Sequence, residues 1–199
     1  MLFRGYYFYA MARYQKVLIL FLLTVHLTYG QGVFTNETTT ALQKVIQDYP
    51  NGFRNIRGAL ITSYPETSDY HSIVEIPGAV NAVISQYHAG NRDSYSWKST
   101  VYNVEEFEEA VIKYNELFSQ IRNTIIKVHD EKPFILTGKY ETPASSRKNT
   151  TSVFHPFSAG TLMQQLKIEL SLQYAVTEWK IVLSVYDNDA TRIEELMVR

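Results

Sequence analysis

Two consecutive segments near the end of the chain alternate apolar and polar residues with a period of two. Apolar side chains occupy every second position over residues 166–176 and again over residues 179–185, with lysine, glutamate, serine and glutamine among the residues between them. Successive side chains of a strand point to opposite faces, so each segment is expected to be a strand with one buried and one solvated face. The short connection at residues 177–178 predicts a β-hairpin.

Two amphipathic helices are predicted earlier in the chain. Apolar residues recur at helical spacing over residues 42–49, where the Thr38–Thr40 run offers an N-cap, and over residues 107–125, where Asn103 and Glu106 fit a capping arrangement. Strand patterns over residues 80–84 and 95–101 predict a second hairpin. Two further strands are predicted at residues 134–140 and 153–157, and the proline in the latter is typical of an edge strand.

Strands in these predictions occur as hairpins and do not alternate singly with helices. This order predicts an α+β domain with an antiparallel sheet of about five to six strands and two helices packed on one face, in the order α-β-β-α-β-β-β-β. No long internal repeat is visible in the sequence.

The first thirty residues differ in kind from the rest. They carry Arg4, Arg13 and Lys16 and no acidic residue, followed by an apolar run over residues 17–25 and by small residues at Thr28 and Gly30. This pattern predicts a secretory signal peptide cleaved after residue 30, because the apolar run is about half the roughly 20 residues that a membrane span needs. We therefore expect an exported protein, periplasmic or secreted, with no stable membrane anchor after cleavage.

The predicted domains are a signal peptide (residues 1–30, with Met11 as an alternative start), a polar tether (31–40) and one α+β domain (41–199). The full chain has a net charge of −1, and removing the three basic residues of the signal leaves −4. An acidic domain of this kind is a poor partner for nucleic acid. The chain contains no cysteine, so neither disulfides nor thiol chemistry is available, and its motifs predict no cofactor.

Four side chains in the first strand region are candidates for acid–base or metal chemistry. Asp69 and His71 lie two residues apart and would share a face on an extended segment, and His88 or Asp93 could join them. The alternative is that all four occupy polar turns and strand ends, because a metal site usually needs three or four ligands. We therefore predict no metal site.

The first hairpin is also rich in aromatic residues. Tyr87, Tyr95, Trp97 and Tyr102 could form a stacking face for a sugar or a peptide. The alternative is ordinary core packing, because strands favour aromatic residues and tyrosine and tryptophan normally bury most of their rings.

Three functions are consistent with these features. The leading hypothesis is a non-enzymatic exported module that binds a protein, peptide or glycan, or that packs in an envelope assembly. The second is a small periplasmic hydrolase with a serine, histidine and carboxylate set from distant positions, since such triads are defined by geometry and no Gly-x-Ser-x-Gly elbow is present. The third is a carbohydrate or peptide binder that uses the aromatic hairpin. Asn36 and Asn149 match the glycosylation acceptor pattern, whose use depends on the source.

Overall fold

Nine strands form one antiparallel sheet in the part of the chain that the structure, a computed structural model, describes: residues 36–89 and 92–187. The predicted signal peptide and residues 31–35 of the predicted tether lie outside the described residues. Within that described part, neither helix combines the length and apolar character that crossing a membrane requires.

The elements follow one another as a helix, four strands, a second helix and five strands. Their bounds are α2 Glu37–Asp48, β1 Arg57–Ser63, β2 Thr67–Ser72, β3 Asn81–Ala89, β4 Arg92–Val104, α3 Phe107–Ile121, β5 Ile125–Ile126, β6 Phe134–Gly138, β7 Asn149–Phe157, β8 Leu166–Ala175 and β9 Glu178–Asp187. Short 3-10 turns are present at Tyr49–Asn51, Arg54–Ile56 and Thr161–Met163.

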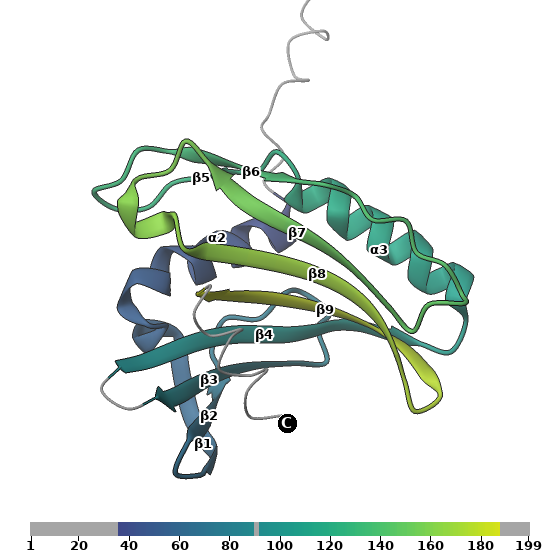
Figure 1. The fold of residues 1–199 in the computed structure, drawn as a ribbon, viewed down its shortest axis with the longest axis horizontal. Coiled ribbons are helices and arrows are strands. Elements are labelled where there is room, and N and C mark those ends of the chain that lie inside the picture. Colours follow the sequence, from purple (N-terminus) through teal and green to yellow (C-terminus); the bar gives the residue numbers. More distant parts are fainter. Residues whose placement is uncertain (1–35, 90–91, 188–199) are drawn as a thin grey trace, which may run out of the picture. The chain divides into compact units, whose positions relative to one another are not determined.

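The strand order in the sheet is β1-β2-β3-β4-β9-β8-β7-β6-β5. Each helix is followed by a meander of neighbouring strands, and the last strands of the two meanders, β4 and β9, pair antiparallel in the middle of the sheet (Figure 1). The chain therefore consists of two consecutive halves, α2 with β1–β4 and α3 with β5–β9, each a helix followed by a meander of strands, which meet at the β4–β9 pair.

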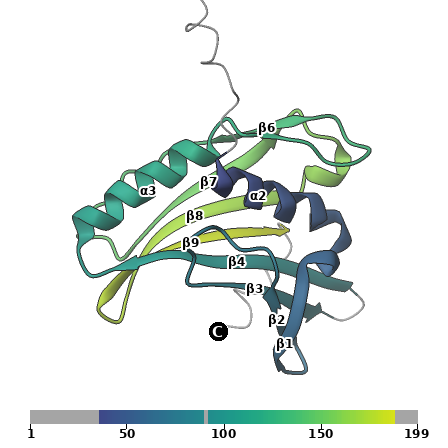
Figure 2. The same cartoon turned by 180° about the vertical axis from the view of Figure 1, so that it is seen from behind.

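Figure 2 shows α2 and α3 in front of the strands, and Figure 1 shows the same sheet from the other side. We call the side of the sheet toward the helices the inner face and the opposite side the outer face. The inner face and both helices contribute to one apolar core, whose largest fully buried side chains include Trp97, Tyr114, Phe53, Phe134 and Phe154. Removing this apolar surface from water is the main driving force for folding.

The hairpin predicted from the alternating segments near the C-terminus is confirmed. β8 and β9 pair antiparallel from Leu166↔Asp187 to Ala175↔Glu178. Most of the predicted apolar residues face the core, so that Leu170 and Leu183, which pair with each other, are 0% exposed. Tyr174 and Val176, at the turn end of the hairpin, are exceptions: they are 41% and 91% exposed, and Val176 follows the last residue of β8. The prediction succeeded because the inner positions are apolar and the outer ones mostly polar, which is the pattern that alternation detects.

The predicted fold class was wrong. The described residues form a mostly β structure with a nine-stranded sheet, not five to six strands, and the order of elements is α-β-β-β-β-α-β-β-β-β-β. The missed strands include β1 and β2, because no strand was predicted before residue 80. β2, Thr67–Ser72, is polar at five of its six positions, so it has no apolar alternation to reveal it. Its pairing with β1 and β3 holds it in the sheet despite its sequence.

Several predicted boundaries were also wrong. α2 begins at Glu37 and is capped by Asn36, whose Oδ1 accepts a hydrogen bond of 2.8 Å from the Thr38 backbone N–H. Asn103 is not a helix cap, because it belongs to β4 and pairs with Lys180. β7 is an interior strand between β6 and β8, and its Pro156 lies next to the strand's last residue.

α3 begins at Phe107 and ends at Ile121, earlier than the apolar rhythm predicted. The chain leaves the helix at Asn123, whose φ of 65° is in the left-handed region that asparagine tolerates better than most residues. Ile125 and Ile126, which extended the helical pattern, instead form β5 and pair with β6.

A buried carboxylate organises the turn between α2 and β1. Asp48 is 5% exposed, and its Oδ2 accepts hydrogen bonds from the backbone N–H groups of Asn55 (2.8 Å) and Ile56 (3.2 Å). Gly52 has a φ of +61°, and a Cβ there would lie 2.8 Å from the Tyr95 ring, so glycine is required on both grounds. This turn fixes the start of β1 and therefore the position of Arg57, the first residue of that strand.

Candidate functional site

The outer face carries a polar hollow with a volume of about 270 Å³ across the middle of the sheet. It is formed by four neighbouring strands, β4, β9, β8 and β7, whose outward side chains alternate with those of the core. The hydroxyl-bearing residues that line it are Ser96, Thr151, Ser171, Ser184 and Tyr186. Because these side chains project from paired strands, the hollow has a rigid floor.

The centre of the hollow is a cross-strand row. Ser184 on β9 pairs with Lys98 on β4 and with Glu169 on β8. The Tyr186 hydroxyl donates a hydrogen bond to Glu169, which fixes that carboxylate beside the row. The lining thus contains one cation and one anion among uncharged hydroxyl and amide groups, so it offers hydrogen bonds without a net charge.

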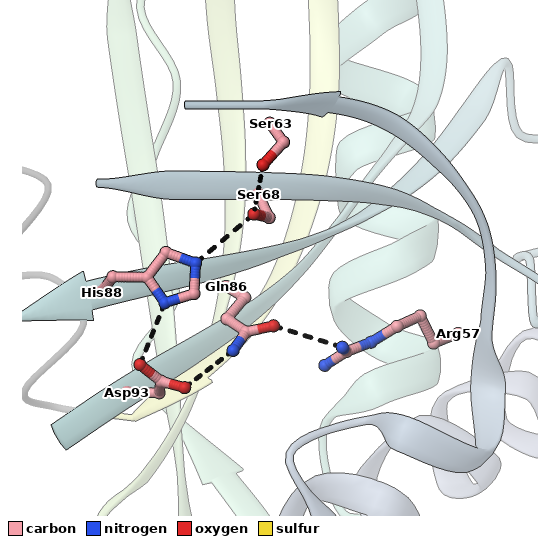
Figure 3. A network of polar contacts seen from close by, with 6 residues as sticks. All are labelled: Arg57, Ser63, Ser68, Gln86, His88 and Asp93. Atoms are coloured by element: carbon pink, nitrogen blue, oxygen red, sulfur yellow. Dashed lines mark hydrogen bonds and ion pairs between the residues drawn. The ribbon is translucent and has the colours of Figure 1, made fainter. Parts of the chain in front are cut away.

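A second polar cluster lies on the inner face, at the tips of the β1–β2 and β3–β4 hairpins (Figure 3). The Ser68 Oγ lies 3.3 Å from His88 Nε2, and His88 Nδ1 lies 3.1 Å from Asp93 Oδ1. Ser63 extends the chain, with its Oγ 3.0 Å from the Ser68 Oγ. We call Ser63, Ser68, His88 and Asp93, with Gln86 and Arg57 described next, the hairpin-tip network.

Gln86 and Arg57 complete the network from the side of the core. The Gln86 amide Nε2 donates a 2.7 Å hydrogen bond to Asp93 Oδ2, and its Oε1 accepts one of 3.2 Å from Arg57. The Arg57 guanidinium lies 4.4 Å from the centre of the Tyr70 ring, a cation–π distance. Both oxygens of Asp93 are therefore held in place, one by a histidine and one by an amide.

Hydrogen bonding controls the electrostatics of this network. The hydrogen bond from His88, with a smaller contribution from that of Gln86, lowers the pKa of Asp93 below its usual value. When the His88 ring is neutral and donates from Nδ1 to this carboxylate, Nε2 has a free lone pair and accepts from the Ser68 hydroxyl. The arrangement can therefore withdraw a proton from a serine.

The candidate acid–base residues fall into two groups on opposite faces. His88 and Asp93 form a cross-strand pair on the inner face. Asp69 and His71 share the outer face, as their spacing predicted, and the Asp69 Oδ1 accepts a 2.6 Å hydrogen bond from Ser85. The four predicted candidates do not converge, and no group of three potential metal ligands exists among the residues that the structure describes.

The four aromatic residues proposed as a ligand face are also divided. Trp97 is fully buried in the core and donates a 2.9 Å hydrogen bond from its ring N–H to the Ser72 hydroxyl. Tyr95 and Tyr102 are half-buried and pack against the same core, and Tyr102 donates to Glu109, which raises its pKa. Tyr87 lies on the outer face with Tyr186. The structure does not gather these rings on one surface.

The residues that were not predicted from the sequence are Ser63, Ser68, Gln86 and Arg57 in the network, and most of the hollow. Ser68 fell in a segment taken for a loop, and its partner His88 is twenty positions away, so only the register of β2 with β3 brings them together. The polar positions of residues 167–173 were correctly placed on the face opposite the core, although Ser171 there is only 6% exposed. These residues lie near Lys98 only because β4 pairs with β9, and this pairing cannot be predicted from a local sequence pattern.

No family model matches this chain, and neither a curated protein nor a solved structure matches it. Its function is therefore inferred from its own residues.

Proposed function

We propose that this chain is an exported binding domain that holds an uncharged, hydroxyl-rich ligand, a saccharide, in the outer-face hollow. The observation that carries the proposal is the hollow itself, lined by hydroxyl and amide side chains from four paired strands. Both helices lie on the other face of the sheet, so neither obstructs it (Figure 1).

The lining favours a neutral polar ligand over an ionic or apolar one. Ser96, Ser171 and Ser184 are each less than 10% exposed, so their hydroxyls have fixed positions on the floor. The Gln173 Nε2 donates a 2.8 Å hydrogen bond to the Ser171 Oγ, which orients that hydroxyl further. A saccharide can exchange hydrogen bonds with such groups, whereas an apolar ligand would displace water from them without replacing the hydrogen bonds of that water, at a cost of about 1–3 kcal/mol for each bond lost.

A saccharide site also needs an apolar surface beside its polar groups, and a tyrosine ring can provide one. Tyr186 supplies this ring at one end of the hollow and contacts Tyr87, which forms a small apolar cluster with it. The proposed saccharide site therefore uses one residue of the predicted aromatic set, Tyr87, as a neighbour and does not involve Tyr95, Trp97 or Tyr102.

The test is titration calorimetry of the full chain with soluble oligosaccharides: maltohexaose, cellohexaose, chitohexaose and laminarihexaose. We expect at least one to bind more tightly than about 1 mM. Ser184→Leu places an apolar side chain in the centre of the hollow and should abolish that binding. Thr62→Leu, on β1 three strands away from β4, is the matched control and should bind as the unmodified chain does.

Two results would count against the proposal. If no oligosaccharide of the panel binds, the ligand class is wrong. If one binds and Ser184→Leu binds it equally well, the hollow is not the site.

A further inference from the structure

We propose that the hairpin-tip network is a separate catalytic site, in which Ser68 is a nucleophile that hydrolyses esters of small carboxylic acids. This activity goes beyond the binding function, because the network lies on the inner face of the sheet and the hollow on the outer face. The proposal rests on the geometry of three side chains brought together from β2, β3 and β4.

The two histidine nitrogens are used in the order that nucleophilic catalysis requires. His88 Nδ1 faces a carboxylate at 3.1 Å and Nε2 faces a serine hydroxyl at 3.3 Å (Figure 3). A base that contacts both the nucleophile and a third orienting group is the signature of an activated serine. The serine–histidine distance is somewhat long, as catalytic hydrogen bonds often are before substrate binds.

Asp93 is a positioning residue in this arrangement. Its carboxylate keeps the proton of a neutral His88 on Nδ1, and Gln86 holds the second carboxylate oxygen at 2.7 Å. Arg57 in turn donates to Gln86, so the position of the base is fixed through three hydrogen-bonded side chains from β4, β3 and β1. Such outer support determines how well a catalytic group is oriented.

Access to the nucleophile limits the substrate to small acyl groups. Ser68 is 6% exposed, whereas the side chains of His88 and Asp93 are about one-third and two-fifths exposed, and Ser63 is exposed. The Ser63 hydroxyl, 3.0 Å from the Ser68 Oγ, is a donor next to the position of the ester carbonyl oxygen. It can therefore hydrogen-bond the negative charge that develops there.

The reaction proceeds in two balanced halves. The Ser68 Oγ forms a bond to the ester carbonyl carbon while its proton moves to His88 Nε2, and the carbon–oxygen bond to the alcohol then breaks as His88 returns that proton to the leaving oxygen. Water next attacks the acyl-Ser68, giving its proton to His88, and the Ser68 oxygen leaves and takes the proton back. The products are a carboxylic acid and an alcohol, with the protein unchanged.

The experiment measures two reactions of the full chain: covalent labelling by a fluorophosphonate, with the modified residue located by mass spectrometry, and hydrolysis of p-nitrophenyl acetate. We expect the label on Ser68 and none on Ser68→Ala. His88→Gln should slow both reactions by at least about 100-fold, since general base catalysis contributes that much. Ser85→Ala is the control, because Ser85 hydrogen-bonds to a carboxylate without a histidine.

Asp93→Asn supplies a readout that a merely structural role would not move. The amide N–H group that this substitution places facing His88 Nδ1 favours the wrong imidazole tautomer, so kcat for p-nitrophenyl acetate should fall while KM stays unchanged and the chain stays folded by near-ultraviolet circular dichroism. The proposal is overturned if Ser68 is not labelled above the Ser68→Ala background, if the label falls on Ser63, or if His88→Gln, shown to be folded, reacts as fast as the unmodified chain.

Discussion

The two halves of the molecule share an order of elements but differ in the chemistry of their inner faces. In the second half, the first four inward residues of β8, Leu166, Ile168, Leu170 and Leu172, are all at most 1% exposed. The corresponding strand of the first half, β3, begins in the same way with buried Ala82 and Ile84. It then continues with two polar residues, Gln86 and His88, which belong to the hairpin-tip network.

The difference follows from where the helices lie. α3 contacts β4, β8 and β9, so the inner face of β8 is covered by a helix. The far end of β3 carries side chains that are partly exposed, and polar residues there lose little solvation. An inner face therefore needs apolar residues only where a helix covers it. The uncovered end is where a reactive group can sit within a folded sheet.

The largest expected effect tests this contrast directly. Leu170→Ala removes a fully buried side chain under α3 and should lower the free energy of unfolding by about 2–5 kcal/mol. Gln86→Ala, on the corresponding strand of the first half, should lower it by less than about 1.5 kcal/mol, the net value of a hydrogen bond. Urea unfolding of both variants measures the two losses. Equal losses would show that the hairpin tips are as much part of the core as β8.

A smaller effect is expected from removing the hydrogen bonds that join α3 to β7 and β8. The Tyr114 hydroxyl is buried and donates to Ser152 on β7 (2.7 Å) and to the Leu170 carbonyl on β8 (3.3 Å). Tyr114→Phe should cost about 1–3 kcal/mol, because it removes both hydrogen bonds from a buried site and leaves Ser152 Oγ with only the bond from the Glu141 backbone N–H. Tyr64→Phe, at a side chain exposed to solvent, is the control and should leave stability unchanged.

The same substitution has a pH signature. Burial raises the pKa of Tyr114 to about 12, from an ordinary value of 10. A raised folded-state pKa means that the stabilisation is complete below pH 10 and is lost as the pH rises from 10 through 12. The unmodified chain should therefore lose stability more steeply than Tyr114→Phe in this interval. Parallel curves of unfolding free energy against pH would contradict the assignment.

The sequence predicted the second half of the fold better than the first. Alternation located β8 and β9 because their inner positions are apolar and their outer ones are polar apart from Ala175, Val182 and Tyr186. It failed at β2, whose inward residues include Ser68 and Ser72, because a strand with polar residues on both faces has no period to detect. β2 was missed for this reason. β1 was missed because its apolar residues, Ala59, Leu60 and Ile61, form a short run without alternation.

Some residues of the candidate sites were identified from the sequence, but most of their contacts with one another were not. His88 and Asp93 were singled out from the sequence and do contact each other, since the hairpin that joins them is local. Ser68 and Lys98 were not placed, because their partners depend on the β2–β3 and β4–β9 registers. Register between strands is set by the packing of the whole inner face, which a single segment of sequence does not contain.

The smallest expected effect compares two histidine–aspartate pairs, one in each half. In the hairpin-tip network, the hydrogen bond from His88 lowers the pKa of Asp93 in the folded chain below the ordinary aspartate value of about 4. The pair therefore stabilises the folded chain above about pH 4. This stabilisation is lost as the pH falls through the folded-state pKa. Asp93→Asn removes that dependence, and the stability difference from the unmodified chain should shrink below pH 4. Because both side chains are partly exposed, water and salt screen the interaction and keep the difference small.

The second half supplies the matched control. His129 and Asp130 lie 3.4 Å apart, but their side chains are 96% and 87% exposed. Asp130→Asn should therefore leave the pH dependence of unfolding unchanged, and its left-handed backbone (φ 60°) accepts asparagine as well as aspartate. If both substitutions change the acid limb of the unfolding curve equally, proximity alone accounts for the Asp93 effect. If only Asp93→Asn does, the fixed hydrogen bonds from His88 and Gln86 distinguish the network from an ordinary surface pair.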